Sequence, residues 1–356
     1  MSELFSPITI GQCTVKNRAW VSPMCQYSAV DGVIGDWHRV HLGAFATGGA
    51  GLIMAEATAV EPAGRISLHC PGLWNDAQAA AWRPVVDFAH EHGAMIGIQV
   101  AHAGRKGSTL APWEDHAHAS LDEGGWQTVA PSPVAFEGYP EPRALTPGEI
   151  EDLVESFADG ASRARAAGFD LVEIHAAHGY LLHQFLSPLS NHRDDHYGGS
   201  FENRIRFLLA VVDAVRERLS GAPLFVRLSA TDWTEGGWDL ASTIALAQIL
   251  REHGVDLIDA SSGGNVGGVH IPVAPGYQVP FAEAVRREAG IATSAVGLIT
   301  EPLQAEAIIR DGRADAVMLA RAYLRNPRWA LNAAESLGEV IEWPAQFDRA
   351  RTVRHG

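Results

Sequence analysis

The chain has 356 residues, 47% of them hydrophobic, and a formal net charge of −15 at pH 7. This length and apolar content suffice for one large domain or two ordinary ones. The negative charge repels phosphate groups, so nucleic acids and anionic membranes are not expected as partners.

The N-terminal residues and the cysteines bear on where the protein is found. Residues 1–7 have neither a basic start nor an apolar stretch, so we expect no export signal. No run of about 18 apolar residues occurs, which predicts no transmembrane helix. The cysteines, Cys13, Cys25 and Cys70, are too few and too scattered for a disulfide framework. Together these features predict a cytoplasmic protein.

Short apolar runs recur along the chain and predict β-strands. They lack an alternation of polar and apolar residues, which is typical of parallel strands buried on both faces. Several follow a glycine that we expect to end the preceding helix in a left-handed conformation, namely Gly49, Gly168, Gly254 and Gly312. The expected strands are residues 19–23, 51–57, 94–100, 170–175, 224–229, 256–261, 292–296 and 315–320.

The stretches between these runs carry helix start signals. Residues 146–149 form a capping box with proline at the first helical position, which predicts a helix to about residue 167. Similar starts are expected at residues 200, 239 and 300–302. Strands that alternate with helices in this way predict an α/β fold, a closed (β/α)8 TIM barrel. The alternative is an open doubly wound sheet, which the lack of a Gly-x-Gly-x-x-Gly motif after the first strand disfavours.

One connection is much longer than the others. Residues 103–145, after the third predicted strand, contain proline, glycine and aromatic residues without helical periodicity. Loops of this length in compact domains are usually lids or caps. We therefore predict a single domain over residues 1–356, in which residues 103–145 form a capping loop at the carboxyl ends of the strands.

Two imidazoles and a phenol follow one another closely at the end of the fourth predicted strand, as His175, His178 and Tyr180. Folds of this class place their chemistry at this end of the strands. The imidazoles could donate hydrogen bonds to a substrate oxygen while Tyr180 delivers a proton. Alternatively, the His-x-x-His pair could hold a metal, or both histidines could be loop residues without a function. The spacing alone leaves these interpretations open.

Polar residues also occur at the other strand ends, which a purely structural barrel does not need. At the last two ends, Gly297 lets backbone N–H groups approach an anion, and Arg321, directly after Ala320, adds a charged donor. These features predict a ligand that carries a phosphate, with a surface salt bridge as the alternative for Arg321. The remaining strand-end residues are 22–27, Glu56, Ala57, Gln99, His102, Arg227 and 261–263.

Several motifs resemble those of the Old Yellow Enzyme family. They are residues 22–27 (Ser-Pro-Met-Cys-Gln-Tyr), 102–106 (His-Ala-Gly-Arg-Lys), 175–180 (His-Ala-Ala-His-Gly-Tyr) and the long stretch 185–204. Cys25 with Tyr27 is similar to the branch of xenobiotic reductases and thermophilic-type ene-reductases. The resemblance runs from about residue 4 to residue 349 and so covers nearly the whole chain.

The resemblance implies an FMN-binding barrel in which NADPH or NADH reduces the flavin and an activated alkene reoxidises it. Arg227 would stabilise negative charge on the reduced flavin, and Gln99 would pair with the pyrimidine edge, because an amide both donates and accepts. Cys25 would act beside N5 and tune the redox potential, with a small buried apolar residue as the alternative. The further flavin contacts that the family implies are Ser22, Pro23, Met24, Ala57, Ser262, Gly297, Ala320 and Arg321.

The resemblance also implies a reaction. His175 and His178 would hydrogen-bond the carbonyl oxygen of an enone or enal, so that the β-carbon accepts hydride. Tyr180 would protonate the α-carbon, and Tyr27 would contact the substrate. Lys106 matches a family residue near the flavin, with a solvated loop lysine as the alternative. The implied function is an FMN-dependent ene-reductase, with nitro compounds as further candidate acceptors.

The last segment for which the resemblance implies a role is residues 340–356. Residues 343–349 resemble a segment that this branch inserts into the site of a neighbouring subunit, where Arg349 would contact the substrate. Phe347 stands where many relatives have tyrosine. The implied assembly is a homodimer or homotetramer, and a disordered tail is the alternative.

Two other function classes remain as alternatives. A metal-dependent TIM-barrel hydrolase would need histidines and carboxylates at several strand ends, whereas the first strand ends in Ser-Pro-Met-Cys and Arg227 would repel a cation. The second alternative is a flavin-binding module without catalysis. Four closely spaced cysteines for an iron–sulfur cluster are absent from the sequence, which argues against the larger cluster-containing relatives.

Overall fold

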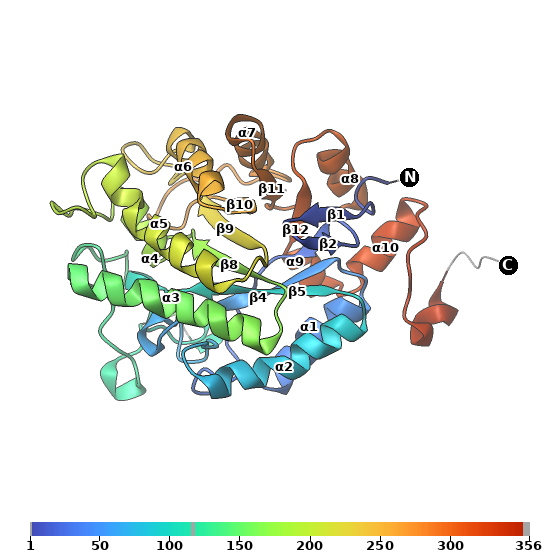
Figure 1. Cartoon of the computed structure of the whole chain (residues 1–356), viewed down its shortest axis with the longest axis horizontal. Helices are drawn as coiled ribbons and strands as arrows, with labels where there is room; N and C mark the ends of the chain where they lie inside the picture. The colour runs from blue at the N-terminus through green and yellow to red at the C-terminus, as the bar shows by residue number, and fades with distance from the viewer. Residues whose placement is uncertain (1, 115–117, 352–356) are drawn as a thin grey trace.

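The computed structural model describes residues 2–114 and 118–351. Eight parallel strands close into a barrel in the order β10-β11-β12-β3-β4-β5-β8-β9 (Figure 1). They are β3 (Ala19–Val21), β4 (Leu52–Ala59), β5 (Met95–Ala101), β8 (Leu171–Ala176), β9 (Leu224–Ser229), β10 (Leu257–Ser261), β11 (Ala292–Ala295) and β12 (Ala316–Leu319). The predicted TIM barrel is confirmed, and every predicted strand coincides with one of these.

Helices lie between the strands on the outside of the barrel (Figure 1). They are α1 (Asp36–Thr47), α2 (Asp76–Glu91), α3 (Pro147–Ala167), α4 (Leu181–Leu186), α5 (Phe201–Arg218), α6 (Leu240–Glu252), α7 (Val279–Ala289), α8 (Pro302–Arg310), α9 (Arg321–Arg325) and α10 (Trp329–Ser336). Among the described residues, none of these helices is long and apolar enough to cross a membrane.

All four predicted helix starts coincide with a helix, and three of them have a side-chain cap, whereas α8 begins at Pro302 without one. The side chains of Thr146, Ser200 and Asp239 each accept a hydrogen bond from a backbone N–H in the first turn of α3, α5 and α6. The glycines that follow the helices adopt a positive φ, which only glycine tolerates well. These φ values are 86° at Gly49, 101° at Gly168, 80° at Gly254 and 68° at Gly312.

The interior of the barrel is apolar near the amino ends of the strands and polar near their carboxyl ends. Trp20 and Phe225 stack inside the apolar half with ring centroids 6.0 Å apart. Ile10 and Val15, from the hairpin of β1 (Ile8–Ile10) and β2 (Cys13–Val15), pack against the same cluster and cover the amino end. The buried residues of the carboxyl half include Gln99, Glu173, Arg227 and Asp259. The polar half is the one that supports a functional site.

In its described part, residues 102–114 and 118–146, the connection between β5 and α3 contains no long helix. It is built from the 3-10 helices η2 (Gly104–Lys106), η3 (Pro112–Glu114) and η4 (Leu121–Glu123) and the short strands β6 (Val129–Ala130) and β7 (Arg143–Ala144). Lys106 Nζ donates to the carbonyl oxygens of His178 and Gly264, at 2.9 and 2.7 Å. The connection therefore contacts the loops at the carboxyl end, and its role as a cap stays a prediction.

Candidate active site

Three aromatic side chains meet at the carboxyl end of β8. The ring centroid of His175, on the strand itself, lies 5.1 Å from that of His178 and 5.0 Å from that of Tyr180. The His175 ring is nearly perpendicular to both, with interplanar angles of 87° and 77°. Tyr180 occupies the N-cap position of α4, so the start of that helix fixes its backbone. The structure thus brings together the residues of the predicted motif.

The surroundings set the protonation of these groups. Burial and the nearby positive charge of Arg227 hold the pKa values of His175 and His178 well below the usual range for histidine. Burial, with smaller effects of the thiols and phenols around it, raises the pKa of Tyr180 well above its usual value. Near neutral pH the site therefore presents two neutral imidazoles and a protonated phenol, all of which can donate hydrogen bonds.

Contacts of the imidazoles with their neighbours constrain the ring protons. The Ala177 N–H donates to His175 Nδ1 at 3.3 Å, so the proton of that ring lies on Nε2. His178 Nε2 lies 2.7 Å from Ser261 Oγ. Ser261 Oγ is also 3.5 Å from Gln278 Oε1, a much weaker contact.

The barrel interior beside these rings holds a layer of buried polar residues, in which Arg227 is the β9 residue paired in register with His175. Arg227 Nε is 2.7 Å from Asp259 Oδ2, and Arg227 Nη2 donates to Ser22 Oγ at 2.9 Å. Gln99 Nε2 donates to Glu173 Oε1 at 2.7 Å. Burial and the charge of Asp259 raise the pKa of Glu173 to about 8, although Arg227 acts against them. Three of the predicted flavin contacts, Ser22, Gln99 and Arg227, are therefore held in place by buried partners.

The predicted phosphate residues line one small cavity. Gly297, Ala320 and Arg321 surround a space of about 130 Å³ between the ends of β11 and β12. Gly297 has a φ of 117°, and a Cβ there would approach Gln278 Nε2 to 2.9 Å, so a larger residue is disfavoured. Ser262 does not line the cavity, but Ser262 Oγ donates to Gln278 Oε1 at 2.5 Å.

Further residues line this cavity that the sequence did not predict as phosphate contacts, among them Gln278 and Arg325. Arg325 is four residues after Arg321 in α9, so the helical repeat puts both cations on one face. That spacing was a signal in the sequence that could have been used. Gln278 comes from the N-cap position of α7, and no local pattern in the sequence identifies it.

Cys25 and Tyr27 belong to an apolar cluster at the mouth of the barrel. Cys25, Tyr27 and Tyr180 pack against buried Ala57 and Cys70. The contact with the Cys70 thiol, together with burial, raises the pKa of Cys25 well above its usual value. Pro23 and Met24 are partly buried beside them, and Met24 packs against the main core. Nothing in the sequence had connected Cys70 with Cys25, because the two are 45 residues apart along the chain.

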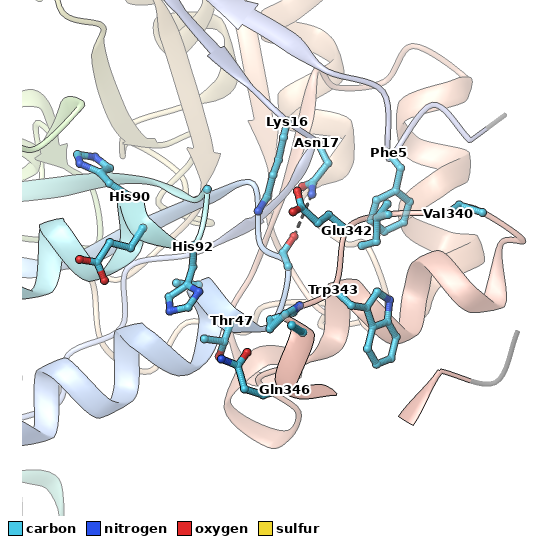
Figure 2. A pocket seen from close by; sticks show the side chains of 17 residues that line it. Phe5, Lys16, Asn17, Thr47, His90, His92, Val340, Glu342, Trp343 and Gln346 are labelled. Carbon is cyan, nitrogen blue, oxygen red and sulfur yellow. Dashed lines mark hydrogen bonds between the residues drawn. The ribbon is translucent and has the colours of Figure 1, made fainter. Parts of the chain in front are cut away.

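The C-terminal segment lies at the other end of the barrel. Residues 340–346 line a cavity of about 770 Å³ together with Lys16, Asn17 and residues 90–93 (Figure 2). Lys16 and Asn17 precede β3 and residues 90–93 precede β5, so the cavity lies at the amino ends of the strands. Arg349 lies in the exposed 3-10 helix η5 (Ala345–Ala350) that follows. Within a single chain, Arg349 is not brought together with His175 and Tyr180. Its role in a neighbouring subunit stays a prediction.

The structure bears on the metal alternative as well. Within residues 2–114 and 118–351, no group of three or more His, Cys, Asp or Glu side chains is arranged to hold a metal ion. His175 and His178 have Arg227, Ser261 and Tyr180 as neighbours.

Comparisons with known proteins match nearly the whole chain. The model of the NADH:flavin oxidoreductase / NADH oxidase family matches residues 3–339. An NADPH dehydrogenase of Geobacillus thermodenitrificans is 51% identical over 349 residues, which are 97% of this chain and 98% of the relative. An NADPH dehydrogenase of Listeria innocua is 50% identical over 353 residues, or 98% of this chain and 99% of the relative.

Solved structures with the same fold include two reductases. Morphinone reductase is 32% identical with a TM-score of 0.80, and the match covers 96% of this chain and 91% of that protein. A complex of morphinone reductase with tetrahydroNAD gives a TM-score of 0.79 at 32% identity, over 97% and 93% of the two chains. A 2-naphthoyl-CoA reductase complex is 25% identical with a TM-score of 0.86, over 95% of this chain but only 52% of the other.

Proposed function

Because the chain belongs to the NADH:flavin oxidoreductase / NADH oxidase family, also called the Old Yellow Enzyme family, we propose that it is an ene-reductase acting on enones and enals. It is an NAD(P)H-dependent FMN oxidoreductase. When bound, FMN carries hydride from the nicotinamide to the acceptor. The observation that carries the substrate proposal is the convergence of His175, His178 and Tyr180, three uncharged hydrogen-bond donors, at one point of the barrel mouth.

The donor set of the barrel mouth fits FMN. Arg227 supplies a fixed positive charge, and Gln99 is held by Glu173 so that its amide oxygen remains available to an imide N–H. The cavity beside Gly297 carries Arg321 and Arg325, which suits a phosphate. The residues that would hold the cofactor are Ser22, Pro23, Met24, Cys25, Ala57, Gln99, Arg227, Ser262, Gly297, Ala320 and Arg321, with Gln278 and Arg325 added.

The two imidazoles would bind the carbonyl oxygen of the substrate. His175 has its proton on Nε2, since Nδ1 already accepts the Ala177 N–H. We assign Ser261 as the donor to His178 Nε2, because this 2.7 Å contact is far shorter than the contact of Ser261 with Gln278. That assignment leaves a proton on Nδ1 of His178. Two N–H donors would then stabilise the negative charge that develops on the oxygen as the β-carbon accepts hydride.

Tyr180 would donate the proton that the α-carbon needs. Its high pKa keeps the phenol protonated across the neutral range. Its ring adjoins His175, so the phenol and the carbonyl clamp, as we call the pair His175 and His178, can contact the same substrate molecule. Tyr27, whose ring lies 5.9 Å from that of Trp113, would line the other side of the substrate. Arg349 would contact the substrate only from a neighbouring copy of the chain.

The proposal can be tested in one cuvette. The visible flavin band of the FMN-loaded protein is followed without oxygen through addition of NADPH and then of 2-cyclohexenone. We expect the band to bleach with NADPH and to return with the enone, together with saturated ketone in the product. Bleaching without return would refute the enone as acceptor, and a nitroalkene added next would then test the nitro alternative.

A further inference from the structure

The turn between β8 and Tyr180 has an unusual backbone. His178 has a φ of 58° and Gly179 a φ of 72°, so two consecutive residues are left-handed. For a residue with a side chain this conformation costs about 1–2 kcal/mol. At Gly179 a Cβ would collide with the carbonyl oxygen of Gly264, so the position requires glycine. Strain of this kind persists only where surrounding groups hold it.

Four side chains from three segments, η2, α4 and β9, hold the turn. They bind both peptide groups of His178 and Gly179, which have no backbone partners in the described hydrogen bonds. The His178 N–H donates to Ser229 Oγ at 2.9 Å, and the His178 carbonyl accepts from Lys106 Nζ at 2.9 Å. The Gly179 N–H donates to His183 Nδ1 at 2.9 Å, and the Gly179 carbonyl accepts from Gln184 Nε2 at 2.7 Å. A side chain therefore binds each N–H and each carbonyl group of His178 and Gly179 and fixes the orientation of these groups.

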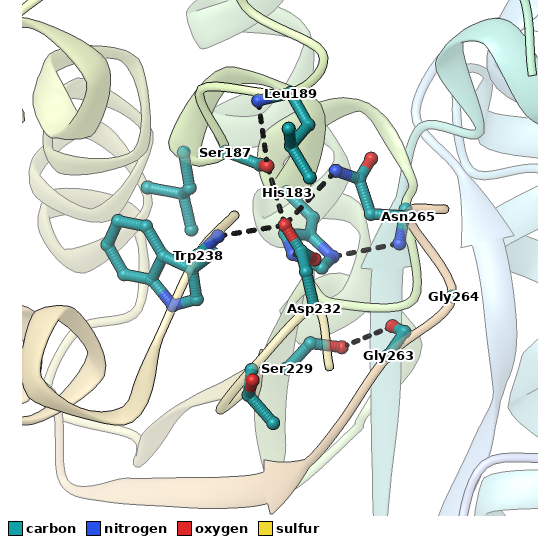
Figure 3. A network of polar contacts seen from close by, with 12 residues as sticks. His183, Ser187, Leu189, Ser229, Asp232, Trp238, Gly263, Gly264 and Asn265 are labelled. Carbon is teal, nitrogen blue, oxygen red and sulfur yellow. Dashed lines mark hydrogen bonds and ion pairs between the residues drawn. The ribbon is translucent and has the colours of Figure 1, made fainter. Parts of the chain in front are cut away.

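His183 has no access to solvent or substrate. It lies in α4, and its side chain is completely buried. Because Nδ1 accepts the Gly179 N–H, the ring proton lies on Nε2, which faces Asp232 Oδ1 at 3.0 Å (Figure 3). Both ring nitrogens are thus occupied by protein groups, so His183 is not placed to react.

Several hydrogen bonds hold the carboxylate of Asp232 in place. Its second oxygen accepts from Ser187 Oγ at 2.6 Å and from the Trp238 N–H at 2.9 Å (Figure 3). Asn265 Nδ2 adds a longer contact of 3.4 Å. Burial raises the pKa of this carboxyl, but the contacts with His183, Ser187 and Trp238 prevail and lower it to about 2. Asp232 therefore stays ionised in neutral solution and keeps the Nε2 proton of His183 in place.

We propose that His183, oriented by Asp232, is a positioning residue that fixes the His178–Gly179 turn and so aims Tyr180 at the α-carbon of the substrate. This inference rests on the proposed function, since it assigns Tyr180 a proton to deliver. The physical link is short, because the Gly179 peptide bound by His183 immediately precedes Tyr180. A displacement of about 1 Å at a reacting group costs on the order of a hundredfold in rate.

Two substitutions at His183 separate positioning from bulk. His183→Leu removes the acceptor of the Gly179 N–H but keeps an apolar side chain in the buried space. His183→Asn keeps an acceptor, because an amide Oδ1 on Cγ can take the place of the ring Nδ1, while the contact with Asp232 is lost. The matched control is His90→Leu, which breaks another His–carboxylate contact, that of His90 Nε2 with Asp170 Oδ2 at 2.9 Å, at the far end of the barrel.

Two electron acceptors make the readout specific. An enone needs a proton on carbon, whereas a quinone takes its protons on oxygen, where solvent can supply them. For His183→Leu we expect kcat with 2-cyclohexenone to fall by about ten- to a hundredfold, with KM little changed. Quinone reduction and flavin bleaching by NADPH should stay within about twofold of wild type. His183→Asn should recover most of the loss, and His90→Leu should behave as wild type.

Other outcomes would overturn the inference. An equal loss with both acceptors would assign His183 a general structural role, and a wild-type kcat for His183→Leu would remove any role. If His183→Leu does not fold, Asp232→Asn replaces it. An amide at position 232 can donate to Nε2 of His183, which moves the ring proton to Nδ1 and removes the acceptor of the Gly179 N–H, so the same selective loss with the enone is expected. Tyr180→Phe tests the underlying function separately. If this variant keeps full enone reduction, the proton-donor proposal fails whatever His183 does.

Discussion

At the amino end of the barrel one arrangement of hydrogen bonds is repeated three times, whereas the carboxyl end carries the candidate site. Asp170, Asp256 and Asp315 each directly precede a barrel strand. Each accepts a hydrogen bond from the backbone at the start of the neighbouring strand, from the N–H groups of Ile96, Leu224 and Thr293 at 2.8, 2.8 and 2.9 Å. Each also contacts a basic side chain from a helix, that of His90, Arg216 or Arg286.

The carboxyl end is built from single, dissimilar contacts. Among the described residues, residues other than glycine adopt a left-handed backbone in five of its loops, at Tyr27, Asp31, Ser108, His178, Trp233 and Leu298, and before a strand at the amino end at Ser220. Beneath them lie buried ionisable groups whose pKa values are displaced, such as Glu173 and His175. The amino end thus stabilises the barrel with one hydrogen-bonding arrangement that occurs at three strands, while the carboxyl end contains strained backbone positions next to the candidate site. Substitutions at the two ends should therefore affect different properties.

The largest effect on function is expected from removing both imidazoles at the carboxyl end. Replacing His175 and His178 together with alanine deletes two donors to a bound oxyanion. We expect the affinity of the FMN-loaded protein for a phenol to fall by about a hundredfold or more, since hydrogen bonds to charged groups are worth about 1.5–3 kcal/mol each. Titration of the visible band that forms when a phenol stacks on the flavin measures it. Unchanged affinity would refute the carbonyl clamp.

A smaller effect is expected at Ser261, which touches only one of the imidazoles. Ser261→Ala removes the hydroxyl that we assign as donor to His178 Nε2, so the ring proton is no longer confined to Nδ1. Phenol affinity should fall by about tenfold, the worth of one hydrogen bond. Ser261→Thr keeps the hydroxyl and is the matched control. Equal affinities of the alanine and threonine variants would contradict the assigned tautomer.

The contrast between the two ends explains what the sequence predicted well. Strands and helix ends depend on local patterns, such as the continuous apolar run before His175 or the glycine at position 168, and these patterns were sufficient for the fold. His175, His178 and Tyr180 are also close in sequence, so their convergence followed from one strand end. Residues such as Ser22 and Arg227 were found because parallel strands end at one edge, although their hydrogen bond joins positions 205 residues apart.

The parts that could not be predicted depend on contacts between distant segments. His183 is one of several polar residues in a buried helix, and only the fold shows that Asp232, 49 residues later, faces it. Cys70 and Gln278 reach the site in the same way, from loops whose own sequences carry no motif. The course of residues 340–346 along the amino end likewise follows from packing, because nothing in that segment specifies which end of the barrel it meets.

Glu173 offers a test of the polar layer through pH. Its carboxyl has a pKa of about 8 in the folded protein but about 4.3 when unfolded, so the folded state binds more protons between these values. The free energy of unfolding should therefore fall as the pH rises from about 4.3 to 8 and should not fall further through this group above pH 8. The variant Glu173→Gln lacks this dependence, because its amide cannot ionise.

The difference in melting temperature between Glu173→Gln and wild type should consequently grow from pH 5 to pH 8 and then level off. Glu149→Gln is the control, because the exposed Glu149 carboxyl has a pKa that its bonds to Arg143 and Thr146 lower to about 2. Its ionisation is nearly complete in both states over this range, so its difference should change little. A constant difference for Glu173→Gln as well would show that this carboxyl is ionised in the folded protein.

The smallest effect on function is expected at the amino end. Asp256→Ala removes the acceptor of the Leu224 N–H and the partner of Arg216, and should lower the free energy of unfolding by about 1–3 kcal/mol. Urea denaturation measures this loss, and Asp170→Ala and Asp315→Ala should give losses of similar size because they remove the same arrangement. For each variant, kcat per folded molecule should equal the wild-type value. If any of them changed kcat while remaining folded, the amino end would contribute to the reaction, and the division between the two ends of the barrel would not hold.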